Sequence, residues 1–376
     1  MNQIVFAVSG AISAILFILP FAIVVGIVAF AHELGHFLVA RWRRVQVEVF
    51  SIGMGPELFG FTDRYRTRWR LSAFPIGGYV RFAGDRNALS APDDGAPAGV
   101  QRASLAAQPL PARAAIVAAG PIASFAAAIL AFSGLAYFVG ETIVPPRVGG
   151  VVAGSAAEKS GFLPGDLVKS IDGRPVAVFQ DISNFVSLRP GRAIAFVIER
   201  GGRETPLVAT PTLTTIEFGG VRERVGRLGI TPPLDSVDVL TVHPDLVGAL
   251  RIGLARCWMI VGVTGDYVSQ IAAGRAGADQ LAGPIGIAQF SHAAASFGVV
   301  ALINLAAMLS LSLGLVNLLP VPMLDGGHLL FYAIEGLRGK ALSRRSQEFG
   351  LRIGVTLVLA LTLLVTVNDL RRLFEW

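Results

Sequence analysis

The sequence is poor in cysteine and in charge. Cys257 is the single cysteine among 376 residues, which excludes an internal disulfide and a zinc cluster held by thiolates. Charged residues make up only 15% of the chain, hydrophobic residues make up 53%, and the mean hydropathy is +0.61. This composition is too apolar for an ordinary soluble protein and indicates a membrane protein with a soluble insert.

Two further features are missing from the sequence. No basic stretch is interleaved with aromatic residues, and the net charge is only +6, so we expect no nucleic-acid partner. The first apolar run has no basic region before it, and we therefore interpret it as a span and not as a cleavable signal peptide. Many arginines stand beside apolar runs, where they are typical of membrane-topology determinants.

Long apolar segments predict a polytopic α-helical membrane protein with about four transmembrane helices. The segments run over about residues 11–40, 112–139, 297–319 and 353–367, and the last is short enough for an interfacial helix. Basic residues follow the first and third segments, which the positive-inside rule places on the cytoplasmic side; these are Arg41, Arg43, Arg44, Arg338, Lys340, Arg344 and Arg345. Arg371 and Arg372 fall on the other side and disagree mildly with this orientation.

The segments between the spans predict three other parts. Alternation and glycine punctuation over 45–84 favour a small membrane-associated β-sheet on the cytoplasmic side, followed by a flexible linker over 85–110. Short strand patterns and one helix near residues 180–188 predict a compact α/β module over 143–233. Apolar residues at helical spacing over 245–273 predict an amphipathic helix on the outer membrane surface. The expected domains are 1–142, 143–233, 234–296 and 297–376.

The motif His32-Glu33-Leu34-Gly35-His36 lies at the end of the first apolar segment. Histidines at i and i+4 share one helix face, where both imidazoles can hold one metal ion. Glu33 is placed to act as the base for an attacking water. Counting about 1.5 Å per residue, His32 lies ~13 Å below the basic boundary at Arg41. Ionisable groups at this depth are costly, and they suggest hydrolysis inside a membrane.

A third metal ligand is expected, since zinc in a catalytic site has three protein ligands and one open position. Asp325 is the candidate, because prolines and glycines break the third apolar segment around it, and broken backbone at membrane depth must line a cavity or be buried in protein. The predicted cofactor is one zinc ion per chain. Asn317 is a candidate for substrate or oxyanion binding. The other candidate substrate-binding residues are Pro320, Pro322, Gly149 and Gly150.

Simpler interpretations exist for each residue. Two histidines can be hydrogen-bonded inside a helical bundle, although this explains neither Glu33 nor Asp325. Asp325 alone can be a capping residue, and Asn317 can make an interhelical contact. His328 is interpreted as structural or as a supporting neighbour of the metal site. Alternative functions are a non-catalytic scaffold with a relic metal site, or a transporter; four spans without an evident repeat argue against the transporter.

The chain resembles the site-2 protease family of intramembrane zinc metalloproteases, and most closely the bacterial regulator of sigma-E protease group. The similarity covers nearly the whole chain. It rests on the motif at 32–36 and on segments 50–56, 75–80, 119–121, 282–286 and 317–327. Residues 143–233 look like a bacterial PDZ domain, with 226–230 as the closing strand. Such a domain binds peptide ends or acts only as a steric filter.

The resemblance implies a zinc endopeptidase of the inner membrane that cuts single-span membrane proteins already trimmed by another protease. It implies anti-sigma factors and remnant signal peptides as substrates, a periplasmic PDZ domain, and an active site near the cytoplasmic face. It also implies a membrane-re-entrant sheet that holds the unwound substrate as an added strand. The chain departs from the family pattern in two ways: it has room for one PDZ domain, and Ser124 replaces a frequent asparagine, so that a polar contact there is expected to be weak or absent. The sequence makes no prediction about the oligomeric state.

Overall fold

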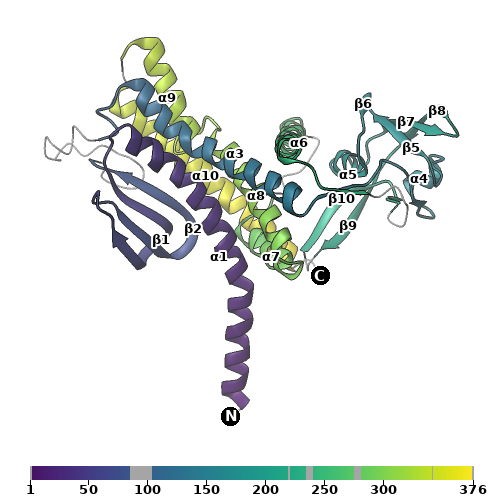
Figure 1. Cartoon of the computed structure of the whole chain (residues 1–376), viewed down its shortest axis with the longest axis horizontal. Helices are drawn as coiled ribbons and strands as arrows, with labels where there is room; N and C mark the ends of the chain where they lie inside the picture. The colour runs from purple at the N-terminus through teal and green to yellow at the C-terminus, as the bar shows by residue number, and fades with distance from the viewer. Residues whose placement is uncertain are drawn as a thin grey trace. The chain divides into compact units, whose positions relative to one another are not determined.

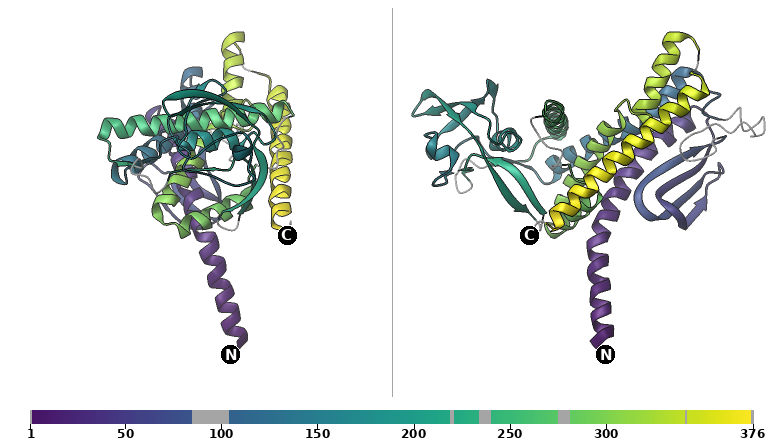
Figure 2. Two further views of the ribbon diagram at one scale, coloured as in Figure 1. Left: turned by 90° about the vertical axis from the view of Figure 1, so that its right-hand side faces the viewer. Right: turned by 180° about the vertical axis from the view of Figure 1, so that it is seen from behind.

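A computed structural model describes residues 2–84, 104–218, 221–233, 240–274, 281–340 and 342–374, so most of the expected linker lies outside the described residues. The chain divides into two compact units, one made of Met1–Phe132 with Ala282–Phe374 and the other of Ser133–Leu281. The helices of the first unit are α1 (Asn2–Trp42), α3 (Leu110–Phe138), α7 (Pro284–Ser296), α8 (Val299–Asn317), α9 (Asp325–Arg338) and α10 (Arg344–Phe374). Figures 1 and 2 show the chain from three sides.

Five described helices are long and apolar enough to cross a membrane, one more than the four predicted. They cover Leu16–Trp42, Leu110–Phe138, Leu246–Ile271, Val299–Asn317 and Arg345–Leu373. The additional candidate belongs to the segment that the sequence predicts to be an amphipathic surface helix. The last helix extends beyond the apolar residues 353–367 at both ends and is long enough to span, so it need not be a short interfacial helix.

Helices α1 and α3 approach so closely that their backbones touch. A Cβ atom added to Gly35 of α1 would lie 2.2 Å from the carbonyl oxygen of Ala119 on α3. Glycine is therefore required at this crossing. Helix α8 is tied to the same place, because the Ser310 hydroxyl donates a hydrogen bond to the Ser124 carbonyl oxygen at 2.9 Å.

The expected sheet after the first span is present as β1 (Val47–Thr62) and β2 (Arg68–Phe82), and it lies beside α1 in Figure 1. Both strands are long and bent, so Phe50 of β1 pairs with Val80 on one side and with Trp69 on the other. The aromatic rings of Phe37, Phe50 and Trp69 pack together and join the sheet to α1. Toward the other end of the sheet large apolar side chains are exposed, among them Leu58 (68%) and Phe74 (57%).

The segment between α8 and α9 is held in place by close backbone contacts. A Cβ atom at Gly326 would lie 2.3 Å from the carbonyl oxygens of Leu318 and Leu319, and one at Gly354 of α10 would lie 1.5 Å from that of Pro322. These positions have no room for a side chain. Met323 has a φ of 102°, which is a strained conformation for this residue type. The start of α9 is thus fixed by its own loop and by α10.

A buried carboxylate near the end of α10 holds the start of α7. Asp369 of α10 is 2% exposed and accepts hydrogen bonds at 3.0 Å from the backbone N–H groups of Gly283, Ile285 and Gly286. Three free N–H groups at the start of α7 are satisfied in this way by a residue far along the chain. Added Cβ atoms at Gly283 and Gly286 would meet the same carboxylate.

The second unit contains a four-stranded antiparallel sheet in the order β6-β5-β7-β8. The strands are β3 (Glu141–Ile143), β4 (Gly150–Val151), β5 (Leu167–Ile171), β6 (Arg174–Pro175), β7 (Ile194–Arg200), β8 (Arg203–Ala209), β9 (Thr212–Phe218), β10 (Val221–Arg227), β11 (Ile230–Thr231) and β12 (Leu240–Val242), and the helices are α4 (Ala156–Lys159), α5 (Phe179–Ser187) and α6 (Leu246–Ala272). Its core gathers buried side chains such as Phe162, Ile182 and Phe196.

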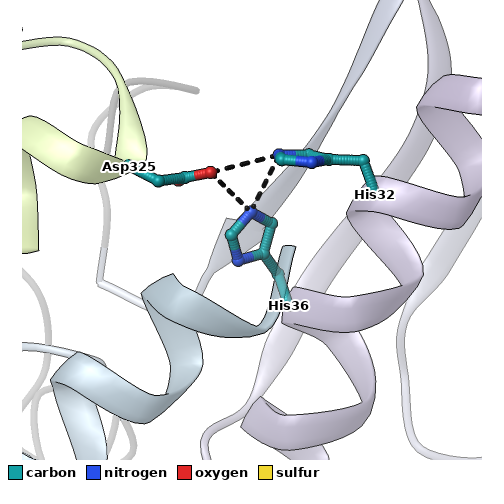
Figure 3. A group of neighbouring side chains, drawn as sticks. All are labelled: His32, His36 and Asp325. Carbon is teal, nitrogen blue, oxygen red and sulfur yellow. Dashed lines mark hydrogen bonds and ion pairs between the residues drawn. The ribbon is translucent and has the colours of Figure 1, made fainter. Parts of the chain in front are cut away.

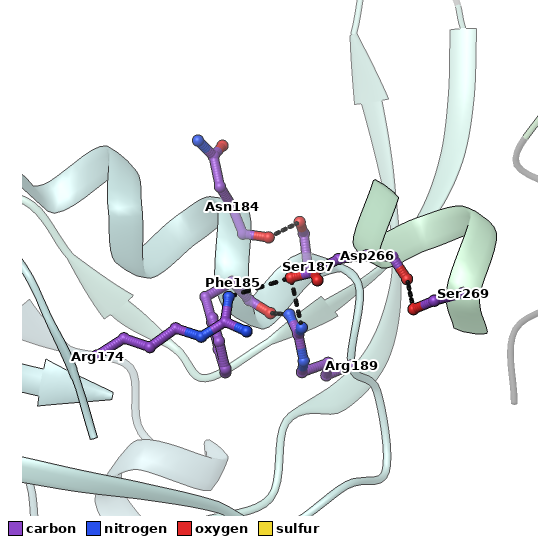
Figure 4. Close-up of polar contacts among 7 residues, drawn as sticks. All are labelled: Arg174, Asn184, Phe185, Ser187, Arg189, Asp266 and Ser269. Atoms are coloured by element: carbon purple, nitrogen blue, oxygen red, sulfur yellow. Dashed lines mark hydrogen bonds and ion pairs between the residues drawn. The ribbon is translucent and has the colours of Figure 1, made fainter. Parts of the chain in front are cut away.

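Helix α6 is attached to β6 and to the segment after α5 by a polar cluster (Figure 4). Asp266 of α6 accepts hydrogen bonds from Arg174 at 3.3 Å and from Arg189 at 3.1 Å. Arg189 is 8% exposed and also donates to the Phe185 carbonyl oxygen at 2.9 Å. Nearer the start of α6, Arg256 pairs with Glu141 at 2.7 Å. Charged side chains of α6 thus pair with the α/β module and with β3 just before it.

The buried ion pair between Asp166 and Arg200 predicts a measurable stability effect. Asp166 is 1% exposed and accepts two hydrogen bonds at 2.7 Å from Arg200, so Asp166→Ala removes the charged partner of the guanidinium and leaves it bonded to the Gly161 carbonyl oxygen. Because Arg200 is partly exposed, we expect a loss of about 2 kcal/mol, below the usual cost of breaking a fully buried pair. Hydrogen exchange of the β5 and β7 amides measures this local stability.

Lys169→Ala is the matched control, since Lys169 and Glu199 form an exposed pair at 2.9 Å between the same strands. We expect its effect to stay below about 1 kcal/mol. Equal exchange in the two variants would contradict the assignment of Asp166 as the stabilising partner.

Candidate functional site

Three side chains from the sequence prediction meet in the first unit (Figure 3). His32 and His36 lie on one face of α1, and Asp325 is the first residue of α9. The Nε2 atoms of the two histidines are 3.3 Å apart, and they lie 3.2 Å and 3.5 Å from Oδ2 of Asp325. The i and i+4 spacing and the break before α9 therefore bring three ligand atoms to one point.

The distances fit a tetrahedral metal site. Ligand atoms that are each about 2.1 Å from a tetrahedral zinc ion are about 3.4 Å apart, close to the three distances observed. Asp325 Oδ2 is buried and has no hydrogen-bond donor among the described residues other than the two imidazoles. In the neutral ring that donates from Nδ1, the Nε2 atom carries no proton and cannot donate to this oxygen, so the buried carboxylate is costly unless a cation is bound. The donor set of two imidazoles and one carboxylate suits zinc.

The far side of each imidazole is held by α3. His36 donates a hydrogen bond from Nδ1 to the carbonyl oxygen of Ile116 at 2.9 Å. His32 Nδ1 lies 3.0 Å from the hydroxyl of Ser124, which is fully buried. These contacts fix the ring orientation and leave both Nε2 atoms free to bind a metal. A polar contact at Ser124 is therefore present and not absent, because α1 and α3 are close enough for the shorter side chain to reach; that it is weaker than an asparagine contact stays a prediction.

Gly120 of α3 forms the wall behind the ligand atoms. An added Cβ atom would lie 2.2 Å from Nε2 of His36 and 2.9 Å from Nε2 of His32. The absence of a side chain therefore leaves the space in which the three ligand atoms converge. The sequence pattern includes Gly120 in its match at 119–121, but it does not indicate this role.

Glu33 faces a cavity of about 450 Å³ together with the three ligands. Strand β2 forms part of the wall, since a Cβ atom at Gly78 would lie 3.1 Å from Cγ of Glu33. Val80 of the same strand lines the cavity beside Glu33. The sheet thus positions the carboxylate beside the metal ligands, where it can exchange a proton with a molecule in the cavity.

The comparisons with known proteins identify the family. The model of peptidase family M50 matches residues 20–361. The chain belongs to peptidase family M50. A relative from Agrobacterium fabrum named as a zinc metalloprotease is 44% identical over 95% of this chain and 96% of its own length. Metalloprotease MmpA of Caulobacter vibrioides is 36% identical over 93% and 94% of the two chains. This M50 peptidase is a zinc metalloprotease with several apolar helices typical of a multi-pass membrane protein.

Solved structures match as well, among them the PDZ domain of an SdrC-like protein from Listeria monocytogenes. It covers 24% of this M50 peptidase and 86% of the smaller chain, with 22% identity and a TM-score of 0.19. A likeness at this level shows no more than a local correspondence.

The candidate substrate-binding residues lie in different surroundings. Asn317 lines the cavity and donates a hydrogen bond to the Leu313 carbonyl oxygen at 3.0 Å. Pro320 is exposed, whereas Pro322 packs against Gly354. Gly149 and Gly150 already pair with β11, the first through a hydrogen bond of 2.8 Å to Thr231 and the second in β4. Their role in substrate binding stays a prediction.

Replacing Gly120 should disrupt the metal site of the M50 peptidase. The methyl group of Gly120→Ala would displace the imidazoles, and we expect the affinity for zinc to fall by at least roughly tenfold, as for other changes beside metal ligands. Competition with a chelator on the purified protein measures this affinity.

Gly134→Ala on the same helix is the control, because nothing lies within 4 Å of a Cβ atom there. It should bind zinc as the wild type does. A similar loss in both variants would show that helix α3 itself, and not the space behind the ligands, is affected.

Proposed function

We propose that this M50 metalloprotease is an intramembrane endopeptidase with His32, His36 and Asp325 as zinc ligands and Glu33 as the catalytic base. The observation that carries the proposal is the convergence of the three ligand atoms at 3.2–3.5 Å on α1 and α9, with two of them inside the candidate span Leu16–Trp42. Ionisable residues in such a span are expensive and are retained for function.

The residues have separate tasks in peptide hydrolysis. Zinc, when bound, polarises the scissile carbonyl group and lowers the pKa of water. Glu33 accepts the proton of the attacking water and later delivers it to the nitrogen of the leaving amine. Asn317, which lines the same cavity, is placed to orient the substrate or to donate a hydrogen bond to the oxyanion.

The substrates that we propose are single-span membrane proteins already trimmed by another protease, such as anti-sigma factors, and remnant signal peptides. A peptide bond within a helix is shielded by its own hydrogen bonds, so the substrate span must unwind before cleavage. The β1–β2 sheet beside Glu33 supports this requirement, because an extended segment can add to a sheet edge. Its exposed apolar side chains favour contact with lipid, as expected for a membrane-associated sheet.

Four of the five candidate helices cross the membrane in the proposed topology, and α6 lies on its surface. The argument is the polar attachment of α6: Asp266 pairs with the α/β module and Arg256 pairs with Glu141 just before it, and charged side chains are costly within a spanning helix. Leu250, Leu254 and Trp258 form an exposed apolar face that suits an interfacial helix.

The location follows from the charge pattern. The basic residues after α1 and α9 favour a cytoplasmic position for these loops, which places the metal site near the cytoplasmic face of a bacterial inner membrane. Residues 143–233 are then periplasmic. We propose that they form a PDZ domain. A peptide would add to the edge of β11 that faces away from β4, because no further described strand pairs with β11 there.

Glu33→Gln separates binding from chemistry. The amide cannot accept the proton, so we expect cleavage of a single-span reporter to fall by roughly 100-fold or more, while zinc content stays unchanged. Proteolysis in reconstituted vesicles, with zinc measured on the same sample, tests this. An active Glu33→Gln protein would refute the mechanism.

Asp325→Ala should have the complementary effect. Removing one of three ligands leaves two imidazoles, and zinc per chain should fall well below one after purification in chelator-free buffer. Glu33→Gln is the matched control, since it also removes a carboxylate from the cavity but leaves the ligands intact. Unchanged zinc content in Asp325→Ala would exclude this residue as a ligand.

A further inference from the structure

A second pair of charged residues lies in the cavity, away from the proposed ligands. Arg113 is on the first turn of α3 and Glu335 is on α9, and both line the cavity. Both guanidinium ends contact the carboxylate, one of them through Nη1 and Oε2 at 3.2 Å. The side chains are only 17% and 18% exposed. A two-contact pair with this burial differs from an ordinary surface ion pair, which contributes little.

Arg113 is held by further contacts besides Glu335. Its Nε atom donates a hydrogen bond to the carbonyl oxygen of Gln108 at 3.1 Å. The guanidinium carbon also lies 4.9 Å from the centre of the Tyr332 ring, one turn before Glu335 on α9. The arginine therefore binds α9 at two successive turns and the segment before α3 at a third point.

The helices that this pair joins are those that build the proposed metal site. Helix α9 begins at Asp325, and α3 contributes Ile116, Gly120 and Ser124 behind the two histidines. Asp325, His328, Tyr332 and Glu335 follow each other at spacings of three, four and three residues, so they share one face of α9, and all four line the cavity. The distance along the helix from Asp325 to Glu335 is about 15 Å.

The two ends of α9 are held by different contacts. The tight backbone contacts of Gly326 and Gly354 fix the start of the helix, and Phe331 in its middle packs against Gly350 of α10. The pair at Arg113 and Glu335 fixes the other end against α3. Metal ligands tolerate displacements of only about 0.2 Å, so a small tilt of α9 is enough to weaken the site.

We propose that Arg113 and Glu335 form a latch that holds α9 against α3 and thereby sets the position of Asp325 relative to His32 and His36. Both are positioning residues and touch neither metal nor substrate. The proposal rests on the proposed function, because it takes Asp325 as a zinc ligand.

Zinc affinity of the full-length purified protein, measured by competition with a chelator, tests the latch. Arg113→Glu and Glu335→Arg should each weaken zinc binding by at least roughly tenfold. The double reversal, Arg113→Glu with Glu335→Arg, restores opposite charges and should recover affinity to within about threefold of the wild type. Arg113→Lys keeps the charge but loses the two-contact geometry, and it should lie between the wild type and Arg113→Glu.

Arg338→Ala is the matched control, because Arg338 is an exposed residue of the same helix. It should bind zinc as the wild type does. Wild-type affinity in both single reversals overturns the proposal, and so does a double reversal no better than the single ones. Arg113→Lys keeps the test decisive if a reversal fails to fold: a weakened but folded Arg113→Lys protein supports the latch, and wild-type affinity in it counts against the latch.

The outcome can be separated from that of the proposed function. Glu33→Gln and the wild type are compared for cleavage of the same reporter, whereas the latch is judged by zinc affinity alone. Equal cleavage by these two proteins would refute the proposed mechanism and leave the zinc comparison between latch variants valid. Lost cleavage in Glu33→Gln combined with unchanged zinc affinity in the latch variants would refute the latch only.

Discussion

The contact between the backbones of α1 and α3 is the constraint on which the rest of the first unit depends. Gly35 permits it on one helix, and Gly120 leaves room for the ligand atoms on the other. At this separation Ile116 and Ser124 can reach the outer nitrogens of the two histidines. A wider separation would leave these imidazole N–H groups without partners in an apolar surrounding, which is costly.

The proposed metal site is divided between a rigid part on one helix and a third ligand from another helix. The two histidines are on one helix and are held by its neighbour, so their relative position follows from helix geometry. Asp325 comes from a different helix after a strained loop with Met323 at positive φ. The third ligand therefore depends on packing against α3 and α10, and strain of this kind is typical of functional sites.

Much of the site could be predicted from the sequence, because spacing on a helix is a local property. The motif at 32–36 predicts two ligands and a base, the prolines and glycines around Asp325 predict the third ligand, and the structure brings the three predicted ligand atoms together. Ser124, Ile116 and Gly120 act across helices, and no local pattern indicates which residues will meet. The fold shows the same limit: the sheet after α1 follows from its alternation, whereas the polar attachment of α6 depends on partners up to 115 residues away.

The closed wall at Gly120 has a consequence for inhibition. Since α3 leaves no space behind the ligand atoms, a chelating compound can approach them only from the cavity, past Glu33 and the strand that contains Gly78. Its size is limited by a space of about 450 Å³, and its flanking groups would contact the sheet and not the histidines. An inhibitor's metal-binding group does not by itself distinguish zinc enzymes with the same ligands. Selectivity would then come from contacts of its flanking groups with β2.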